Sequence, residues 1–196
     1  MSEGHGVGDD RTVANGDGPS RNGLAAGSDG VPPRLGTRVV VLVGNPRPES
    51  RTHTVAARTA RAIAPGTTPE TVDLTELADR LFSRAPSPRL DDAVTKVASA
   101  DLLIVASPTY KGTYTGLLKA FLDRVPSLSG VTALPLLVMG SPRHALAVEV
   151  HLRPLLVELG ASVPTPGLAV VEADLGRLDE ILAEWAATVR LPEAVW

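Results

Sequence analysis

Hydrophobic and polar positions alternate in blocks along the chain from about residue 37 onward. Short apolar runs rich in Val, Leu and Ile are separated by longer stretches in which apolar residues recur every three to four positions. Continuous apolar runs are typical of parallel strands buried on both faces, and the recurring pattern is typical of amphipathic helices. The predicted strands cover residues 38–43, 71–74, 101–106, 133–139 and 163–171.

The stretches between these strands predict helices. The first helix should start near residues 50–53 and end at Pro65-Gly66, and its apolar face consists of Val55, Ala56, Ala60 and Ile63. Further helices are predicted over residues 91–100, 115–124, 143–159 and 175–189. Pro154 should kink its helix because proline has no N–H to donate. Strand and helix in repeated alternation predict an α/β fold with a doubly wound parallel sheet and helices on both faces.

Residues 1–36 differ from the rest of the chain. They contain nine of the 18 glycines, no aromatic residue and no periodic apolar pattern. Such a segment cannot bury enough apolar surface to offset the entropy of ordering it. We therefore expect a disordered glycine-rich tail at 1–36 and one folded domain at 37–196.

Composition excludes several classes of protein. The chain has no cysteine, so it has no disulfide framework and no thiolate nucleophile or metal ligand. A net charge of −3 gives no reason to expect a nucleic acid as partner. No apolar run approaches the roughly 20 residues that cross a bilayer, and the N-terminus lacks a signal-peptide core. We expect a cytoplasmic protein without a membrane or nucleic-acid partner.

The loop after the first predicted strand, residues 45–52, is polar and leads into a helix. A helix N-terminus favours an anion, and Arg47, Ser50 and Thr52 offer a guanidinium and two hydroxyls to phosphate oxygens. The loop lacks both the Gly-Lys-Ser/Thr of a Walker loop and the spaced glycines of a dinucleotide fingerprint. A phosphate monoester is the anion that fits best. The residues alone leave a second interpretation open, in which Ser50 only caps the helix and the arginines are solvated.

A second polar loop follows the third predicted strand. Proline there fixes the chain direction, and the next residues offer backbone N–H groups and an aromatic face to a flat ligand. A glycine permits close approach of the backbone. Its candidate residues are Pro108, Thr109, Tyr110, Lys111, Gly112 and Tyr114.

These two loops together resemble a known family. The segments 44–52 and 107–121, with 140–161, are similar to the NADPH-dependent FMN reductases. The resemblance is closest to the reductases that supply reduced FMN to two-component monooxygenases such as the alkanesulfonate system. It implies a flavodoxin-like sheet of five parallel strands, and it extends from residue 38 to about 172.

The resemblance also implies which residues contact FMN. Its phosphate would bind Arg47, Ser50 and Thr52, beside Asn45, which stands where many members have serine. The isoalloxazine ring would lie along residues 108–112, here Pro108, Thr109, Tyr110, Lys111 and Gly112. A third loop, at Gly140 and Ser141, would border the ring.

Tyr114 matches a tyrosine that, in the resembling subgroup, converts one turn of the following helix into a π-bulge. Members of the family are homodimers or homotetramers in which a neighbouring subunit completes the flavin pocket. His53 is expected as a solvated first-turn residue. The alternatives for His144 stay open, as a flavin contact or as a structural or interface residue.

The implied reaction is hydride transfer from NADH or NADPH to FMN, which the cofactors carry out themselves. No protein residue is assigned as a general acid or base. Two alternatives remain, an FMN-bound reductase of quinones, azo compounds or metal ions, and a flavodoxin-type electron carrier. The carrier is disfavoured because residues 37–196, with 16 basic against 17 acidic side chains, lack a strongly acidic docking surface.

Overall fold

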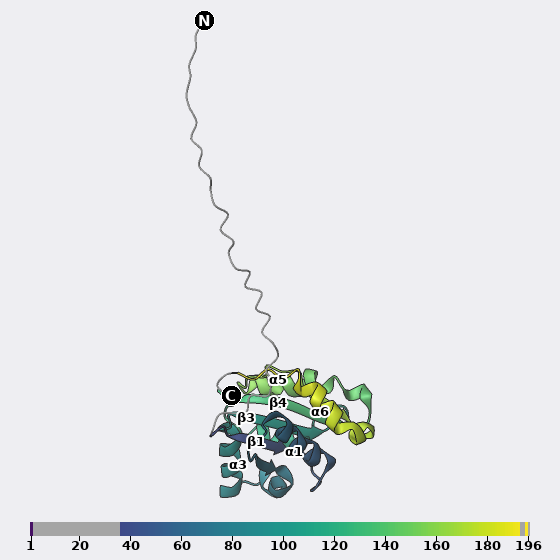
Figure 1. The fold of residues 1–196 in the computed structure, drawn as a ribbon. Helices are drawn as coiled ribbons and strands as arrows, with labels where there is room; N and C mark the ends of the chain where they lie inside the picture. The colour runs from purple at the N-terminus through teal and green to yellow at the C-terminus, as the bar shows by residue number, and fades with distance from the viewer. Residues whose placement is uncertain (2–35, 193–194, 196) are drawn as a thin grey trace.

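The structure is a computed structural model, and it describes residue 1, residues 36–192 and residue 195. Its centre is one sheet of five parallel strands in the order β2-β1-β3-β4-β5, which Figure 1 shows between its covering helices. The strands are β1 Val39–Val43, β2 Glu70–Asp73, β3 Leu102–Pro108, β4 Thr132–Met139 and β5 Leu168–Val171. This strand order is the flavodoxin-like one, and it confirms the predicted fold class.

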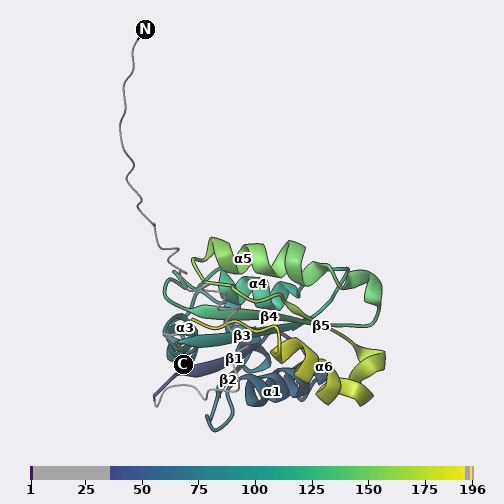
Figure 2. The same cartoon turned by 45° about the horizontal axis from the view of Figure 1, so that its top comes forward.

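Helices cover both faces of the sheet, as Figure 2 shows. On one face lie α1 and α6, and on the other lie α3, α4 and α5. Their bounds are α1 Arg51–Ile63, α3 Pro88–Ala98, α4 Gly116–Leu122, α5 Arg153–Glu158 and α6 Leu178–Ala186. A short 3-10 helix, η1 (Leu74–Leu77), and α2 (Ala78–Leu81) follow β2; the sequence pattern did not predict them.

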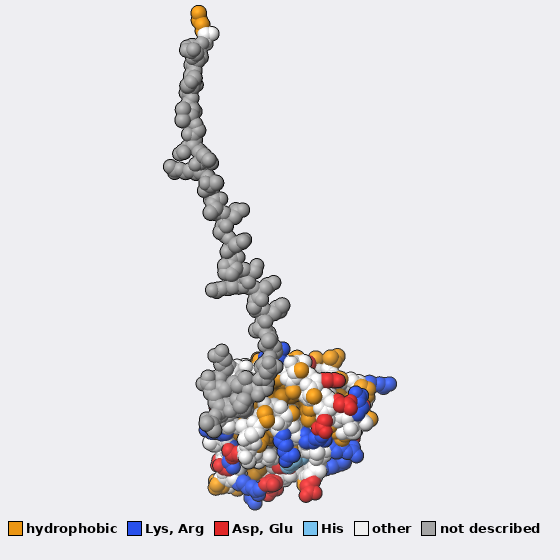
Figure 3. All heavy atoms as spheres, in the orientation of Figure 1, with side chains coloured by type: hydrophobic (Ala, Val, Ile, Leu, Met, Phe, Trp, Pro, Cys, Tyr) orange, Lys and Arg blue, Asp and Glu red, His pale blue; other side chains and the backbone are white. Residues whose placement is uncertain are grey.

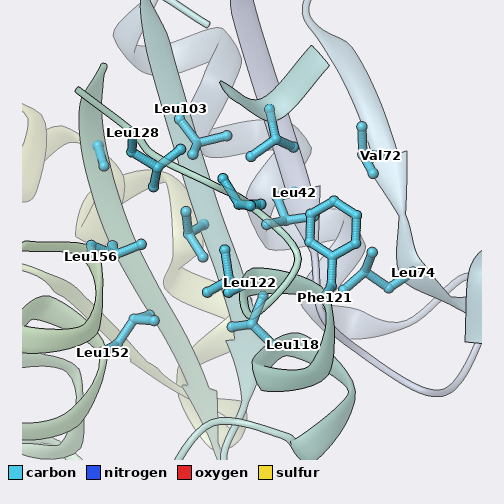
Figure 4. Close-up of a cluster of buried hydrophobic side chains, with 14 of the residues drawn as sticks. Leu42, Val72, Leu74, Leu103, Leu118, Phe121, Leu122, Leu128, Leu152 and Leu156 are labelled. Atoms are coloured by element: carbon cyan, nitrogen blue, oxygen red, sulfur yellow. The ribbon is translucent and has the colours of Figure 1, made fainter. Parts of the chain in front are cut away.

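Successive side chains along each strand point to opposite faces of the sheet and pack into two separate hydrophobic cores. In β1, Val39, Val41 and Val43 pack against α1 and α6, while Val40 and Leu42 pack toward α4. Figure 4 shows the second core, in which Phe121 of α4 lies against Leu42 and Leu74. Because both faces are buried, the strands are continuous apolar runs, as the pattern predicted.

Several boundaries differ from the predicted ones; for example, α3 begins three residues before the predicted helix at 91–100. β3 continues through Pro108, two residues further than predicted, so the second loop begins only at residue 109. β5 begins only at Leu168, and not at residue 163, because Pro164 and Pro166 interrupt the preceding chain. The last helix, predicted over 175–189, begins as α6 only at Leu178, because residues 172–177 form a 3-10 helix, η4 (Glu172–Arg177). The predicted tail at 1–36 lies outside the described residues except at its two ends.

The helix predicted over 143–159 is not one regular helix. It consists of a 3-10 turn at Pro142–His144 (η2), a π-helical turn at Val148–Leu152 (η3) and α5. Pro154 lies in the first turn of α5 and cannot donate to the preceding turn. The Arg153 N–H bonds to the Val148 carbonyl, five residues back, and the helix widens there rather than kinking.

The prediction that Tyr114 introduces a π-bulge into the following helix is wrong for this structure. Tyr114 precedes the helix, Thr115 is the N-cap, and α4 is an ordinary α-helix from Gly116 to Leu122. A cap at Thr115 satisfies the Leu118 N–H, so the first turn needs no widened hydrogen-bond pattern.

An ion pair fixes the π-helical turn to the chain that leads into β5. Glu149 pairs with Arg153 and accepts the Gly167 N–H at 2.5 Å, while Arg153 donates to the carbonyls of Val163 and Thr165, both at 2.5 Å. The hydrogen bond from Arg153 holds the pKa of Glu149 below its ordinary value, and the Gly167 N–H acts in the same direction. This network positions η3 and α5 behind the third loop.

Candidate functional site

The three predicted loops meet at one edge of the sheet. They follow β1, β3 and β4, which are neighbours in the sheet, so their carboxyl ends lie side by side. After β1 the chain adds β2 on one side of β1, and it then adds β3 on the other side, so the strand order reverses at β1. Ligands of open α/β sheets bind at such a reversal of strand order.

The first loop is shaped from within by Asn45 and Thr52. Both are buried, at 6% and 1% exposure. Asn45 Nδ2 donates to Thr52 Oγ1 at 3.1 Å, and Asn45 Oδ1 accepts the Arg47 N–H at 3.0 Å. Asn45 thereby closes the turn onto the first turn of α1. These two side chains support the loop, whereas Arg47 lies on its exposed surface.

The N-terminus of α1 supplies hydrogen-bond donors beside Arg47. Ser50 is the N-cap, and its Oγ accepts the His53 N–H at 3.2 Å while the hydroxyl proton stays available. The N–H groups of Arg51 and Thr52, in the first turn of this 13-residue helix, have no intrahelical partner. The Arg47 guanidinium has no partner among the described residues either. This combination of donors fits a phosphate group.

The second loop is a tight hairpin at the end of β3. Tyr110 and Thr113 pair as an isolated antiparallel bridge, with the Tyr110 N–H donating to the Thr113 carbonyl at 2.8 Å. The two central residues, Lys111 and Gly112, both have positive φ, at 55° and 81°. Two positive φ values are the signature of a type I′ turn. The hairpin leaves Tyr110 at 43% exposure, with its ring accessible to a flat ligand.

A residue that the sequence reasoning missed ties the first and second loops together. Thr115 Oγ1 donates to the Gly44 carbonyl at 2.6 Å and accepts the Leu118 N–H at 3.1 Å. The Thr115 N–H also donates to Ser107 Oγ at 3.0 Å. A threonine directly before a helix signals an N-cap, but its bond to Gly44, 71 residues away, depends on the fold.

The third loop joins the site through His144. Its Nδ1 lies 3.4 Å from Thr109 Oγ1, and its Cδ2 lies 3.9 Å from where a Cβ on Gly112 would be. Gly140 is exposed and Ser141 is the cap of η2, accepting the Arg143 N–H at 3.4 Å. His144 therefore contacts the second loop.

The structure gathers most of the predicted residues at this edge. Tyr114 differs from them, because it is half-buried and packs against the core beneath α4. His53, expected as a solvated residue, instead pairs with Asp73 at 3.1 Å and is partly exposed. In the described part of the chain, no three His, Cys, Asp or Glu side chains are grouped so that they could hold a metal ion. None of the described helices is long and apolar enough to span a membrane.

Comparison with known proteins gives a consistent result. Residues 37–175 match the family described as NADPH-dependent FMN reductase. An FMN reductase (NADPH) of Escherichia coli (strain K12) is 39% identical over 130 residues, covering 63% of this chain and 68% of that protein. The NADH-dependent FMN reductase SfnF of Pseudomonas putida is 32% identical over 177 residues, covering 80% of this chain and 95% of that protein.

A solved structure shows the same fold. The apo form of an NADH:FMN oxidoreductase (EMOB) superposes with a TM-score of 0.68 at 29% identity, covering 81% of this chain and 93% of that one. The strand order and these relatives together define a flavodoxin-like oxidoreductase. Within that class, the chain belongs to the NADPH-dependent FMN reductase family.

Proposed function

We propose that this protein is an NAD(P)H-dependent FMN reductase that releases reduced FMN to a flavin-dependent monooxygenase. The chain belongs to the FMN reductase family. The observation that carries the proposal is the set of free hydrogen-bond donors in its first loop. There, among the residues that the structure describes, the Arg47 guanidinium has no partner, the Ser50 hydroxyl proton is available, and the first N–H groups of α1 make no hydrogen bond. The resemblance to the sulfonate-type reductases supports the monooxygenase as the consumer of reduced flavin.

The residues have distinct roles in this proposal. Arg47, Ser50 and the α1 amides bind the FMN phosphate, and Asn45 and Thr52 hold the loop in shape from below. The hairpin from Pro108 to Gly112, with Gly140 and Ser141, borders the isoalloxazine ring. FMN and the nicotinamide nucleotide supply the hydride-transfer chemistry. The chain's own contribution is to bind and orient both molecules, and we assign no residue as an acid or base.

We expect FMN to bind as a substrate, with a Kd near micromolar, which corresponds to about −8 kcal/mol. The purified protein should then be nearly colourless and should oxidise NAD(P)H only when FMN is added. Absorbance at the flavin band after dialysis and steady-state NAD(P)H oxidation measure both properties. A yellow protein that retains stoichiometric FMN and reduces quinones or azo compounds would instead identify the FMN-bound reductase named above.

We also propose that the protein is a homo-oligomer. Leu146, in the turn before η3, Val150 of η3 and Val157 of α5 are 72%, 57% and 54% exposed, and they are spaced by four and seven residues. An exposed apolar stripe on a helix is typical of an interface. We propose a second copy of this chain as the partner. The stripe starts directly after the third loop, so this copy would lie beside the candidate flavin site. A cytoplasmic location stays a prediction.

The double substitution Leu146→Lys with Val150→Lys should convert the oligomer into a monomer, because it would bury unpaired charge in an apolar interface. Sedimentation velocity measures the assembly directly. Phe82→Lys is the matched control, since Phe82 is 82% exposed but lies in the loop after α2. A monomeric wild type, or an oligomer that survives the double substitution, would contradict this interface.

A further inference from the structure

Basic side chains in this domain are mostly paired. Arg58 of α1 pairs with Asp179 of α6, and Arg51 pairs with Glu172; Figure 3 shows basic and acidic side chains interspersed on the face that α1 and α6 cover. Others, such as Arg89 and Lys96, pair on the opposite face. Within the described part of the chain, the Lys and Arg side chains without a hydrogen bond or ion pair are those of Arg47, Arg61, Arg84, Lys111 and Arg143.

Three of these unpaired cations lie in the three loops of the site. Arg47 belongs to the first loop, Lys111 to the second and Arg143 to the third. Neither segment 107–114 nor segment 140–147 contains an acidic residue. The second and third loops therefore carry two exposed positive charges with no neutralising carboxylate of their own.

Lys111 occupies a position that does not favour lysine. Its φ of 55° is left-handed, and the first central residue of a type I′ turn is most often Asn or Gly. A residue with a Cβ and a long side chain is strained in this conformation, and such strain is concentrated at functional sites. The stability of the turn therefore does not explain a lysine at this position. A requirement for its positive charge would explain it.

Lys111 and Arg143 lie on the same rim of the site. Gly112 follows Lys111 in the chain, and His144 follows Arg143. A Cβ added to Gly112 would lie 3.9 Å from His144 Cδ2, so these two residues are close to each other. Thr109 also contacts His144 at 3.4 Å. Lys111 and Arg143 are thus each one residue away from a group in this contact, and since neighbouring Cα atoms are about 3.8 Å apart, their long side chains extend from two loops that touch and can reach one anion.

We propose that Lys111 and Arg143 form a second anion site, which binds a phosphate of the nicotinamide nucleotide. The inference rests on the proposed function, because that reaction brings two phosphorylated molecules to one sheet edge. The first loop accounts for the FMN phosphate. The nucleotide needs another cationic contact, and these loops provide an arginine for bidentate contact and a lysine as a point charge.

The test measures binding of NADPH, NADH and FMN separately, by titration of the full chain. Lys111→Asn and Arg143→Ala should each weaken nucleotide binding by about 10-fold, the effect of one charge-assisted contact, and should weaken FMN binding much less, because the hairpin backbone that borders the ring is kept. Arg143→Lys should recover part of the loss. Because Asn-Gly suits a type I′ turn, Lys111→Asn should keep or raise the melting temperature, which separates lost charge from lost folding.

Arg61→Ala is the matched control. Arg61 is exposed and unpaired but lies in the last turn of α1, at the opposite end of that helix from the first loop. It should change none of the three affinities. A loss confined to NADPH would assign the site to the 2′-phosphate, and equal losses for NADPH and NADH would assign it to the pyrophosphate.

The proposal is overturned if Lys111→Asn and Arg143→Ala leave nucleotide affinity unchanged. It is also overturned if FMN affinity falls as much as nucleotide affinity, because the two cations would then serve the flavin. Failure of the proposed function has a different signature. The wild type would then bind the nucleotide without oxidising it in the presence of FMN, and the binding titrations would still decide the role of the two residues.

Discussion

Arg47→Ala should weaken FMN binding by about 10- to 100-fold, because a charge-assisted hydrogen bond contributes roughly 1.5–3 kcal/mol and an exposed loop screens part of it. Arg47 is exposed and has no other partner in the described structure, so its charge is free for a phosphate. Riboflavin has the same ring without the phosphate, and its affinity should hardly change. Fluorescence titration of both flavins with wild type and variant measures the difference.

Arg51→Ala provides the matched control for this prediction. Arg51 is four residues away and equally basic, but its guanidinium already donates to Glu172 at 2.5 Å. Its removal should affect FMN far less. Ser50→Ala should act in the same direction as Arg47→Ala but more weakly, because a neutral donor is lost while the helix amides remain. Equal losses for FMN and riboflavin in folded Arg47→Ala would show that the loop does not bind the phosphate.

Gly44→Ala should reduce both stability and flavin binding. A Cβ at Gly44 would lie 2.6 Å from Leu118 Cβ, and neither the strand nor the helix can yield by rotating a side chain. Overpacking of this kind costs about 1–3 kcal/mol. To relieve it, α4 must move away from β1, which stretches the 2.6 Å hydrogen bond from Thr115 to the Gly44 carbonyl. Since that bond joins the first and second loops, FMN affinity should fall by at least about 10-fold.

Gly116→Ala is the control for Gly44→Ala. Gly116 is the first residue of α4, and an added Cβ there has nothing within 4 Å. Alanine should be neutral or stabilising by up to about 1 kcal/mol. Thermal unfolding and FMN titration of the two variants form the comparison. An unfolding temperature and FMN affinity equal to wild type in Gly44→Ala would show that α4 does not need its close contact with β1.

The bond between Thr115 and Gly44 also supports the proposal that one small domain holds both ends of a long flavin. The loop proposed for the phosphate follows β1 and the loop proposed for the ring follows β3, and each could move independently if only the strands held it. Thr115 joins these two loops, and His144 joins the second loop to the third. A site fixed by such contacts loses less entropy when it binds its ligand.

The periodicity of the sequence was enough to determine the fold class. Runs such as 39–43 are apolar at every position because both faces of a parallel sheet are covered, and that information is local. Boundaries were predicted less well wherever a distant partner decides them. The Arg153 guanidinium donates hydrogen bonds to the carbonyls of Val163 and Thr165, and β5 starts only after these two residues. The π-helical turn before Pro154 likewise depends on backbone geometry that a residue pattern does not specify.

The candidate site divides in the same way. The sequence by itself determined that a polar loop with Arg47 and a capping Ser50 follows the first strand, because strand, cap and helix are adjacent in the chain. It gave no indication of the second anion site that we propose, because Lys111 and Arg143 are 32 positions apart and only the sheet order places their loops together. Nor could it pair Thr115 with Gly44. Contacts between distant segments depend on which strands are neighbours, and only the tertiary structure decides that.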